Sequence, residues 1–212
     1  MTRAHGLICL VGVALPATFG VGCSGRPGRI SPPDIDAAVA AELAVKEYDR
    51  NSDAKVDAEE LKACPALADA KSAYDSDGNG SLTQDEIAAG IGTWSKRGVG
   101  AIPLNFLLKL DGRPVDGAQV KLIPVSFLGD AVKPAIGVTD ASGTGIFNMS
   151  AEDRPSNAPK NLAVMQPGLY SVEVTHPTTK IPAKFNTATT LGLEAGIAGQ
   201  SPAGVTWDLK SK

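Results

Sequence analysis

The sequence has few of the residues from which enzymes build catalytic sites. Its 212 residues include two histidines, His5 and His176, and three cysteines, and aromatic residues make up 5%. The HExxH, GxSxG, phosphate-binding-loop and CxxC motifs are all missing. We therefore expect no catalytic activity, and we interpret His176, which stands before Pro177, as a loop residue.

A surplus of basic residues is missing as well. The chain has 20 Lys and Arg against 23 Asp and Glu, which gives a formal net charge of -3. It therefore lacks the basic surface with which proteins bind nucleic acid. In contrast, there are 23 glycines and 15 prolines, a composition that favours short strands joined by many turns over a large helical core.

A short apolar run, Gly6–Ala17, follows basic residues at the N-terminus. Its 12 residues are too few to cross a bilayer, which takes about 20, but they have the length of an export signal. Gly22 and Cys23 resemble the end of a lipobox, although Gly20 stands where that motif usually has leucine. The resemblance implies a lipoprotein signal peptide over residues 1–22 and an acylated Cys23. Such a chain is exported and anchored to a membrane, with the outer membrane or cell surface favoured; the alternative is a plain cleavable signal.

Residues 23–33 are predicted to form a tether between the anchor and the folded part. The prolines and glycine of Arg26–Pro33 (RPGRISPP) oppose regular structure. Cys64 is the one cysteine of the expected folded part, and we interpret it as a small buried residue. If Cys23 is not acylated, a disulfide between Cys23 and Cys64 is the alternative.

The first helix is predicted to begin near Pro33 and Asp34, with Ser31 or Asp34 as its cap. Its apolar stripe is expected to consist of Ile35, Ala38, Val39, Leu43 and Tyr48.

Asp75–Glu86 (DSDGNGSLTQDE) carries oxygen-bearing side chains at alternate positions of a twelve-residue segment. Gly80, at the sixth position, permits the positive φ of a sharp turn. The segment resembles the loop of an EF-hand, which surrounds Ca²⁺ with about 6–8 oxygen atoms. The resemblance implies calcium as the cofactor, with Asp75, Asp77, Asn79, Ser81 (through its carbonyl), Thr83 and Glu86 as ligands. The alternative is an acidic surface turn.

A second, less regular copy of this pattern lies upstream, at Asp49–Glu60. Its sixth position holds Ala54 in place of glycine, and a positive φ there costs roughly 1 kcal/mol. Val56 is expected to lie opposite Leu82 when the two loops pair. The candidate ligands are Asp49, Asn51, Asp53, Lys55, Asp57 and Glu60. The alternative is a vestigial loop that only supports its neighbour.

The helices between and after the loops are expected to be short. Pro65 should divide Leu61–Tyr74 into two helices. The helix Gln84–Trp94 should turn Ile87, Ile91 and Trp94 inward. The three methionines all lie elsewhere, so the segment lacks the Met-rich groove of calcium-dependent switches. We therefore expect a structural role for calcium, with a calcium-responsive regulator as the alternative.

The composition changes at Ser95–Gly100, and this change predicts two domains, an EF-hand pair over 34–95 and a β-domain over 101–212. Together they give an α+β protein. Turns are expected at Asp111-Gly112 and Asp140–Gly143. The expected strands are Ile102–Leu110, Ala118–Pro124, Gly137–Thr139, Gly145–Met149, Gly168–Thr175, Thr190–Ala195 and Val205–Leu209. Roughly seven short strands are typical of an antiparallel β-sandwich.

Three runs of the β-domain resemble the transthyretin-like or carboxypeptidase-regulatory-like sandwich. They are Asp111–Pro124 (DGRPVDGAQVKLIP), Gly137–Met149 (GVTDASGTGIFNM) and Pro167–Val174 (PGLYSVEV). The combination with a lipoprotein signal and EF-hand loops is similar to planctomycete-type bacterial lipoproteins. The resemblance implies a structural or adhesive module with an unknown protein or carbohydrate partner.

A hydrolase built on scattered carboxylates is the remaining enzymatic alternative. It would use Asp130, Asp140, Glu152 and Asp153, which we interpret as solvated turn residues.

Overall fold

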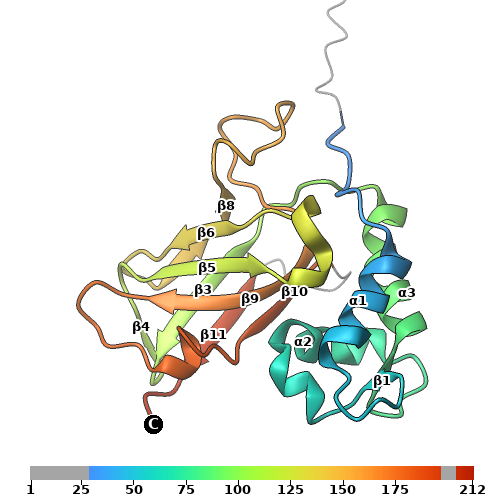
Figure 1. The fold of residues 1–212 in the computed structure, drawn as a ribbon. Helices are drawn as coiled ribbons and strands as arrows, with labels where there is room; N and C mark the ends of the chain where they lie inside the picture. The colour runs from blue at the N-terminus through green and yellow to red at the C-terminus, as the bar shows by residue number, and fades with distance from the viewer. Residues whose placement is uncertain (1–28, 197–203) are drawn as a thin grey trace, which may run out of the picture.

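The computed structural model of the chain describes residues 29–196 and 204–212. It has an α+β fold in which a group of helices lies beside β-sheets (Figure 1). In these ranges no helix combines the length and the apolar character needed to cross a membrane. The predicted signal peptide and Cys23 lie outside the described residues.

The helical part contains α1 (Ala37–Tyr48), a short 3-10 helix η1 (Glu60–Ala63), α2 (Pro65–Tyr74) and α3 (Gln84–Arg97). The start of α1 differs from the prediction, because Asp36 rather than Ser31 or Asp34 caps the helix. Its Oδ1 accepts hydrogen bonds from the amides of Ala38 and Val39. Pro65 occupies the first turn of α2, so the predicted division into two short helices is confirmed.

The buried face of α1 also differs from the predicted stripe. Ala40, Ala41 and Ala44 are buried, whereas Val39 and Leu43 keep 50% and 44% of their surface exposed. The physical reason is the close packing of α1 against α3, in which methyl side chains let two helix backbones approach. The larger side chains then remain on the outer face.

Helix α3 carries the inward face that was predicted. Ile87, Ile91 and Trp94 are at most 2% exposed. The helix continues to Arg97, three residues beyond the expected end, and stops at Gly98, whose φ of +61° no longer continues a right-handed helix. The segment predicted as a domain boundary is thus partly helical.

Nine strands of the described residues form two sheets in the rest of the chain. One sheet has the order β10-β9-β5-β6-β8, and the other has the order β11-β3-β4, with β7 also pairing with β3. The strands are β3 (Asn105–Leu110), β4 (Arg113–Pro114), β5 (Gln119–Pro124), β6 (Ala135–Val138), β7 (Thr144–Ile146), β8 (Asn148–Met149), β9 (Gly168–Thr175), β10 (Gly192–Ala195) and β11 (Val205–Leu209). Two further 3-10 turns are η2 (Ser126–Ala131) and η3 (Ala183–Phe185).

One strand pair departs from the expected antiparallel arrangement. The last strand, β11, runs parallel to β3, with Val205 opposite Phe106 and Leu209 opposite Leu110. The pairing begins where Gly204 lies against the backbone of Asn105, so closely that a Cβ would sit 1.9 Å from the Asn105 carbonyl oxygen. Buried and exposed residues alternate along a strand in the same way in parallel and antiparallel sheets. The sequence pattern therefore did not reveal the direction of β11 relative to β3.

Two predicted turns are present. Asp111 and Gly112 both have positive φ, +51° and +79°, and connect β3 to β4 as a two-residue hairpin turn. Gly143 donates its amide to the carbonyl of Asp140 and closes the turn before β7.

The two sheets share a core of aromatic side chains. The Phe106 and Phe147 rings stack with centroids 4.4 Å apart, and Trp207 meets both rings edge-on or tilted. Gly137 and Gly145 lie against the Phe106 ring, where a Cβ would come within 2.4 Å of it.

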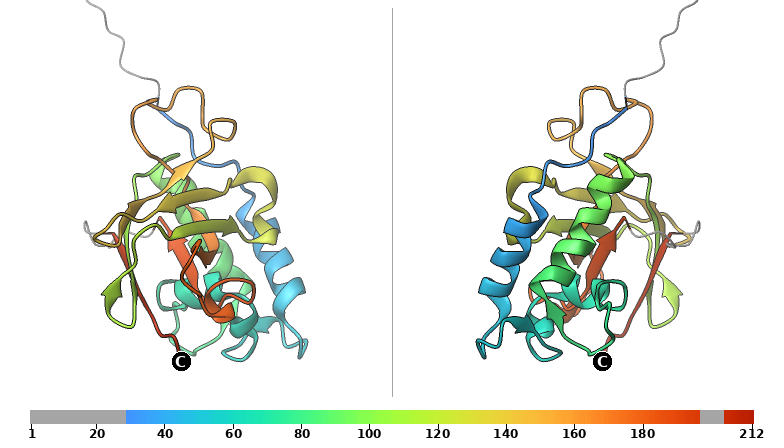
Figure 2. Two further views of the ribbon diagram at one scale, coloured as in Figure 1. Left: turned by 90° about the vertical axis from the view of Figure 1, so that its left-hand side faces the viewer. Right: turned by 90° about the vertical axis from the view of Figure 1, so that its right-hand side faces the viewer.

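This core continues without interruption into the helical part. Buried residues of α1, α2 and α3 belong to the same apolar cluster as Phe106 and Leu193. Helix α2 packs on β9 and β10. Figure 1 shows the helices gathered at one end of the sheets, and the right-hand view of Figure 2 shows them in front of the sheets. Two buried polar contacts join the parts: Trp94 Nε1 donates to Glu194 Oε1 at 2.7 Å, and the Glu194 amide donates to Asp69 Oδ2 at 2.8 Å.

The described end of the predicted tether lies against the folded body. Asn157 Nδ2 donates to the Arg29 carbonyl at 3.1 Å, and Arg29 Nη2 donates to the Arg97 carbonyl, also at 3.1 Å. Pro33 is buried, and the backbone of Ser31 touches Gly100. Residues 29–33 are therefore held by the body, and only residues 23–28 of the tether lie outside the described part.

Truncation of the central ring tests the shared core. We expect Phe106→Ala to lower the free energy of unfolding by about 3–5 kcal/mol, because it leaves a cavity between the sheets. Leu162→Ala, at a side chain that is 55% exposed, is the control and should change the stability by less than about 0.5 kcal/mol. Urea unfolding measures both, and equal effects of the two substitutions would contradict the packing described.

Candidate metal centre

The two acidic loops have the same backbone course. Their fourth residues, Ser52 and Gly78, have φ of +64° and +72°, and their sixth residues, Ala54 and Gly80, have φ of +65° and +88°. Ala54 thus adopts the left-handed conformation for which glycine is the usual residue. Both loops turn sharply at the same two positions.

The side chains at the first and third positions hold both loops in the same way. Asp49 Oδ2 accepts the amide of Ala54, and Asp75 Oδ2 accepts the amide of Gly80, each at 2.9 Å. In the third position, Asn51 Oδ1 accepts the Asp53 amide at 2.9 Å, and Asp77 Oδ1 accepts the Asn79 amide at 3.0 Å. The side-chain oxygens therefore point toward the inside of each loop.

The glutamate at the twelfth position closes each loop. Glu60 and Glu86 are only 5% and 8% exposed. The two oxygens of Glu60 accept the amides of Arg50 at 2.7 Å and Asp57 at 2.9 Å. Those of Glu86 accept the amides of Ser76 and Thr83, both at 2.9 Å. Each glutamate thus joins the beginning of its loop to the end.

A short antiparallel pair of strands places the loops side by side. In β1 (Lys55–Val56) and β2 (Leu82–Thr83), Val56 lies opposite Leu82, as predicted, and both side chains are fully buried. This contact fixes the register of one loop against the other.

The second loop brings three carboxylates together. Oxygen atoms of Asp75, Asp77 and Glu86 lie within 4.8 Å of one another, and this group could hold a metal ion. No second group of three or more such side chains occurs in the part of the chain that the structure describes. The first loop has an amide, Asn51, where the second has Asp77, and its additional carboxylates, Asp53 and Asp57, stand at the fifth and ninth positions.

Other predicted ligands accept backbone hydrogen bonds that stabilise the fold of the loops. Asn79 Oδ1 accepts the Ser81 amide at 2.8 Å, and Asp53 Oδ1 accepts the Lys55 amide at 3.1 Å. Asp57 Oδ1 accepts the amides of Glu59 at 2.8 Å and Glu60 at 3.0 Å, at the start of η1. The Lys55 side chain is exposed.

Thr83 is the cap of α3, a role that the sequence analysis missed. Its hydroxyl accepts the Glu86 amide at 3.3 Å and donates to Glu86 Oε2 at 2.8 Å. The Glu86 carboxylate accepts the Thr83 amide in return, which completes a capping box. The T-x-x-E spacing before a helix was the available signal. One carboxylate therefore closes the loop and starts the helix.

The surroundings of Glu86 favour its charged form. The Thr83 amide, with further hydrogen bonds from the Thr83 hydroxyl and Ser76, lowers the pKa of Glu86 from 4.5 to about 2, although burial opposes this shift. Glu86 is consequently a carboxylate at neutral pH. Each Glu86 oxygen accepts an amide and also a hydroxyl, from Ser76 at 3.0 Å or from Thr83 at 2.8 Å. Because a hydroxyl group can rotate away, each oxygen can offer a lone pair to a cation. These residues fit a hard cation that prefers oxygen ligands.

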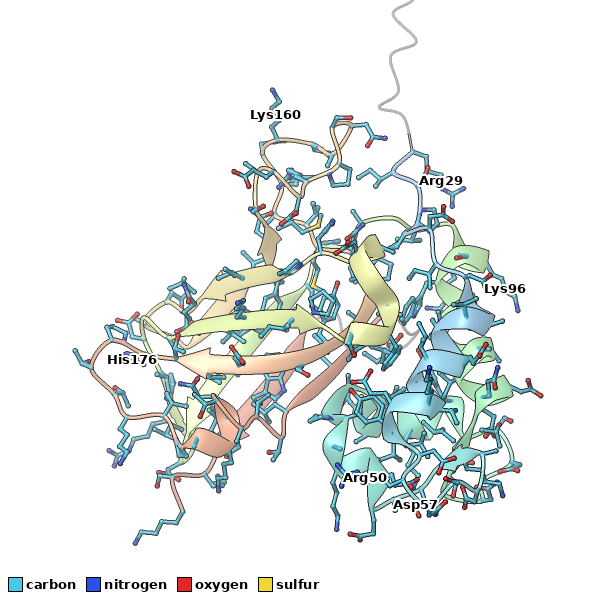
Figure 3. The ribbon with its side chains drawn as sticks, in the orientation of Figure 1. Arg29, Arg50, Asp57, Lys96, Lys160 and His176 are labelled. Atoms are coloured by element: carbon cyan, nitrogen blue, oxygen red, sulfur yellow. The ribbon has the colours of Figure 1, made fainter. Side chains whose placement is uncertain are left out.

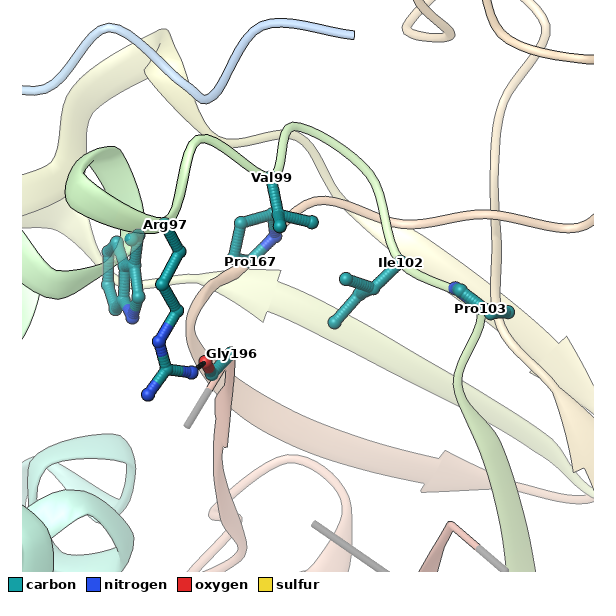
Figure 4. A pocket seen from close by; sticks show the side chains of 7 residues that line it. Arg97, Val99, Ile102, Pro103, Pro167 and Gly196 are labelled. Atoms are coloured by element: carbon teal, nitrogen blue, oxygen red, sulfur yellow. Dashed lines mark hydrogen bonds between the residues drawn. The ribbon is translucent and has the colours of Figure 1, made fainter. Parts of the chain in front are cut away.

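The described residues also include a hollow beside α3 and a histidine that contacts two loops. A hollow of about 290 Å³ beside Trp94 is lined by apolar residues and by Arg97, whose guanidinium donates to the Gly196 carbonyl (Figure 4). His176 follows β9, and its Nδ1 accepts the Thr179 amide at 2.7 Å. Its Nε2 lies 2.7 Å from the Asp116 carbonyl, so the ring joins two loops.

Exchanging the sixth residues tests the left-handed positions. We expect Gly80→Ala to lower the stability of the metal-free protein by about 1 kcal/mol, because φ of +88° lies beyond the left-handed minimum for an L-residue. Space is available for the methyl group, since its nearest neighbour would be Lys71 Nζ at 3.6 Å. Ala54→Gly is the reverse exchange and should stabilise by about 1 kcal/mol or less. Destabilisation by Ala54→Gly would contradict the left-handed conformation assigned to residue 54.

The pH dependence of stability tests Glu86. Its pKa in the folded chain is lower than in the unfolded chain, so its contribution is fully present above about pH 4.5 and is lost as the pH falls toward about 2. Glu86→Gln should destabilise the metal-free protein at neutral pH and remove this acid-dependent loss. Thermal unfolding across that range measures the effect, with Glu152→Gln, at an exposed carboxylate, as the control. An unchanged acid limb in Glu86→Gln would be the contrary result.

Comparisons of the chain with protein-family models, with curated proteins and with solved structures found no match. The proposed function therefore rests on the geometry of the two acidic loops.

Proposed function

We propose that the chain is an exported lipoprotein in which a pair of EF-hand loops binds Ca²⁺ and stabilises a structural or adhesive surface module. The observation that carries this proposal is the convergence of Asp75, Asp77 and Glu86 in a loop whose backbone is repeated by Asp49–Glu60. Two loops with equal turns, equal side-chain hydrogen bonds and a paired strand are the arrangement expected of an EF-hand pair.

The two loops differ in their fitness for calcium. Loop Asp75–Glu86 offers three converging carboxylates and glycine at both left-handed positions. Loop Asp49–Glu60 has Asn51 at the third position and serine and alanine at the left-handed ones. The second loop is therefore the stronger site, with an affinity on the order of 10⁻⁴–10⁻³ M typical of extracellular modules. The first loop binds more weakly or serves as a support.

The transthyretin-like β-sandwich forms the second part of the proposal. The three runs that resemble that family fall on β4–β5, on β6–β8 and on β9, and they include the Asp111-Gly112 and Asp140–Gly143 turns. The stacked Phe106 and Phe147 rings between the sheets agree with such a module. Its surface would meet a protein or carbohydrate partner rather than nucleic acid, and we assign no catalytic activity to it.

The continuous core bears on the choice between a structural and a regulatory role for calcium. Helix α3 begins at the capping box of the stronger loop and reaches the sheets through the Trp94–Glu194 hydrogen bond. An ion that binds only the folded loop would therefore stabilise both parts together. The regulator remains the second candidate, because the same contact could transmit a movement of α3. It predicts that calcium changes amide hydrogen exchange in β9 and β10 beyond the general gain in stability.

Calcium titration tests the central proposal. We expect the wild-type chain to bind calcium in the calorimeter, Glu86→Gln to lose most of the heat and Glu60→Gln to lose a smaller part. The reason is that the twelfth-position glutamate can offer both oxygens to the ion. Asp85→Asn, next to Glu86 in sequence but outside the ligand positions, is the matched control and should bind normally.

Two results of the calcium titration would contradict the proposal. The absence of binding to the wild type at millimolar calcium would exclude a calcium function. Equal heats in Glu86→Gln and Asp85→Asn would exclude loop Asp75–Glu86 as the site. Acylation of Cys23 is measured separately, from the mass of the mature chain.

A further inference from the structure

The place where the chain reaches the folded body defines one end of the molecule. Arg29 lies there, held by Asn157 and by the last turn of α3. Figures 1 and 3 show this end opposite the two acidic loops, beside the loop that joins β8 to β9. We call it the N-terminal pole and define it by the exposed side chains of Arg29, Val99, Lys160 and Leu162.

The N-terminal pole presents large apolar side chains next to basic ones. Leu162 is 55% exposed and Val99 is 39% exposed. Leu162 belongs to a braced loop, because Arg154 donates to the carbonyls of Pro159 and Leu162 and, at 2.8 Å, to Asn148 Oδ1. The loop therefore holds Leu162 outward by its own hydrogen bonds.

The charges of the molecule are distributed unevenly between its two ends. Glu152 and Asp153 accompany the cations of the N-terminal pole, and Asp153 accepts a hydrogen bond from the Ser150 hydroxyl at 2.9 Å. The far end carries a much denser group of carboxylates around the loops, namely Asp49, Asp53, Asp57, Asp75, Asp77 and Asp85. When the loops hold no cation, an anionic surface would therefore repel the far end more strongly than the N-terminal pole.

The covalent chain limits how far this pole can lie from a lipid anchor. Arg29 follows Cys23 by six residues, which span about 20 Å even when fully extended. An acyl group on Cys23 would thus hold the N-terminal pole near the bilayer, and no other part of the described chain is attached so directly.

We propose that the N-terminal pole lies against the lipid bilayer, with Leu162 and Val99 among the headgroups and Arg29 and Lys160 facing anionic phosphates. The inference rests on the lipoprotein part of the proposed function. In this orientation the partner of the N-terminal pole is an anionic phospholipid membrane, and both calcium loops face the aqueous phase. Basic residues near an anionic membrane and apolar side chains at its interface are the two known sources of such adhesion.

Site-directed fluorescence tests this orientation. The full chain is labelled with an environment-sensitive dye at Leu162→Cys or, as the matched control, at Ser72→Cys, an exposed position of α2. Each is mixed with phosphatidylcholine vesicles that contain or lack phosphatidylglycerol. We expect a blue shift of the emission at position 162 with phosphatidylglycerol and none at position 72. Absence of a shift at 162, or equal shifts at both positions, would overturn the inference.

Charge variants separate the contribution of the N-terminal pole to membrane binding from that of the lipid anchor. In a Cys23→Ala background, which cannot be acylated, Lys160→Ala should weaken partition into the anionic vesicles about fivefold. Lys62→Ala, an equal change of charge near the loops, should leave partition unchanged, and equal losses would oppose the inference. The mass of the mature wild-type chain shows independently whether Cys23 is acylated. An unmodified Cys23 would reject the lipoprotein, whereas an acylated chain without a shift at position 162 would reject only the orientation.

Discussion

Val56 and Leu82 meet across β1 and β2, and the arrangement of the helical part depends on this contact. Both side chains are fully buried, and their pairing fixes the two acidic loops in register. Because each loop is also closed by its own glutamate, the directions of the flanking helices are set at the same time. Helices α2 and α3 then reach β10 and the buried side chain of Glu194. A contact of two apolar residues thus positions both the carboxylates and the junction with the sheets.

Glu194 shows how strongly the two parts are joined. A buried carboxylate is stable only when it is well hydrogen-bonded, and the Trp94 indole supplies one of its donors. Tyr74 packs nearby against Gly90, and burial together with the charge of Glu194 raises the pKa of its phenol. Replacement of any of these residues would therefore lower the stability of both the helical part and the sheets.

Local patterns in the sequence were sufficient for some elements and insufficient for others. Loop Asp75–Glu86, the Asp111-Gly112 turn and strand β9 depend on neighbouring residues, so spacing and alternation predicted them. The buried face of α1 depends on what packs against it, and the larger residues Val39 and Leu43 misled the prediction. The burial of Glu194, the docking of Arg29–Pro33 and the parallel pairing of β11 arise from contacts between distant segments. No local pattern encodes such contacts.

The parallel pairing of β3 with β11 has a consequence for the order of folding. Strand β3 begins at Asn105, but its partner is the last strand of the chain, Val205–Leu209. Trp207 of that strand also contributes a ring to the aromatic core. The sheet therefore cannot be completed until Val205–Leu209 has been synthesised, about 100 residues after β3, and contacts of such long sequence separation form slowly.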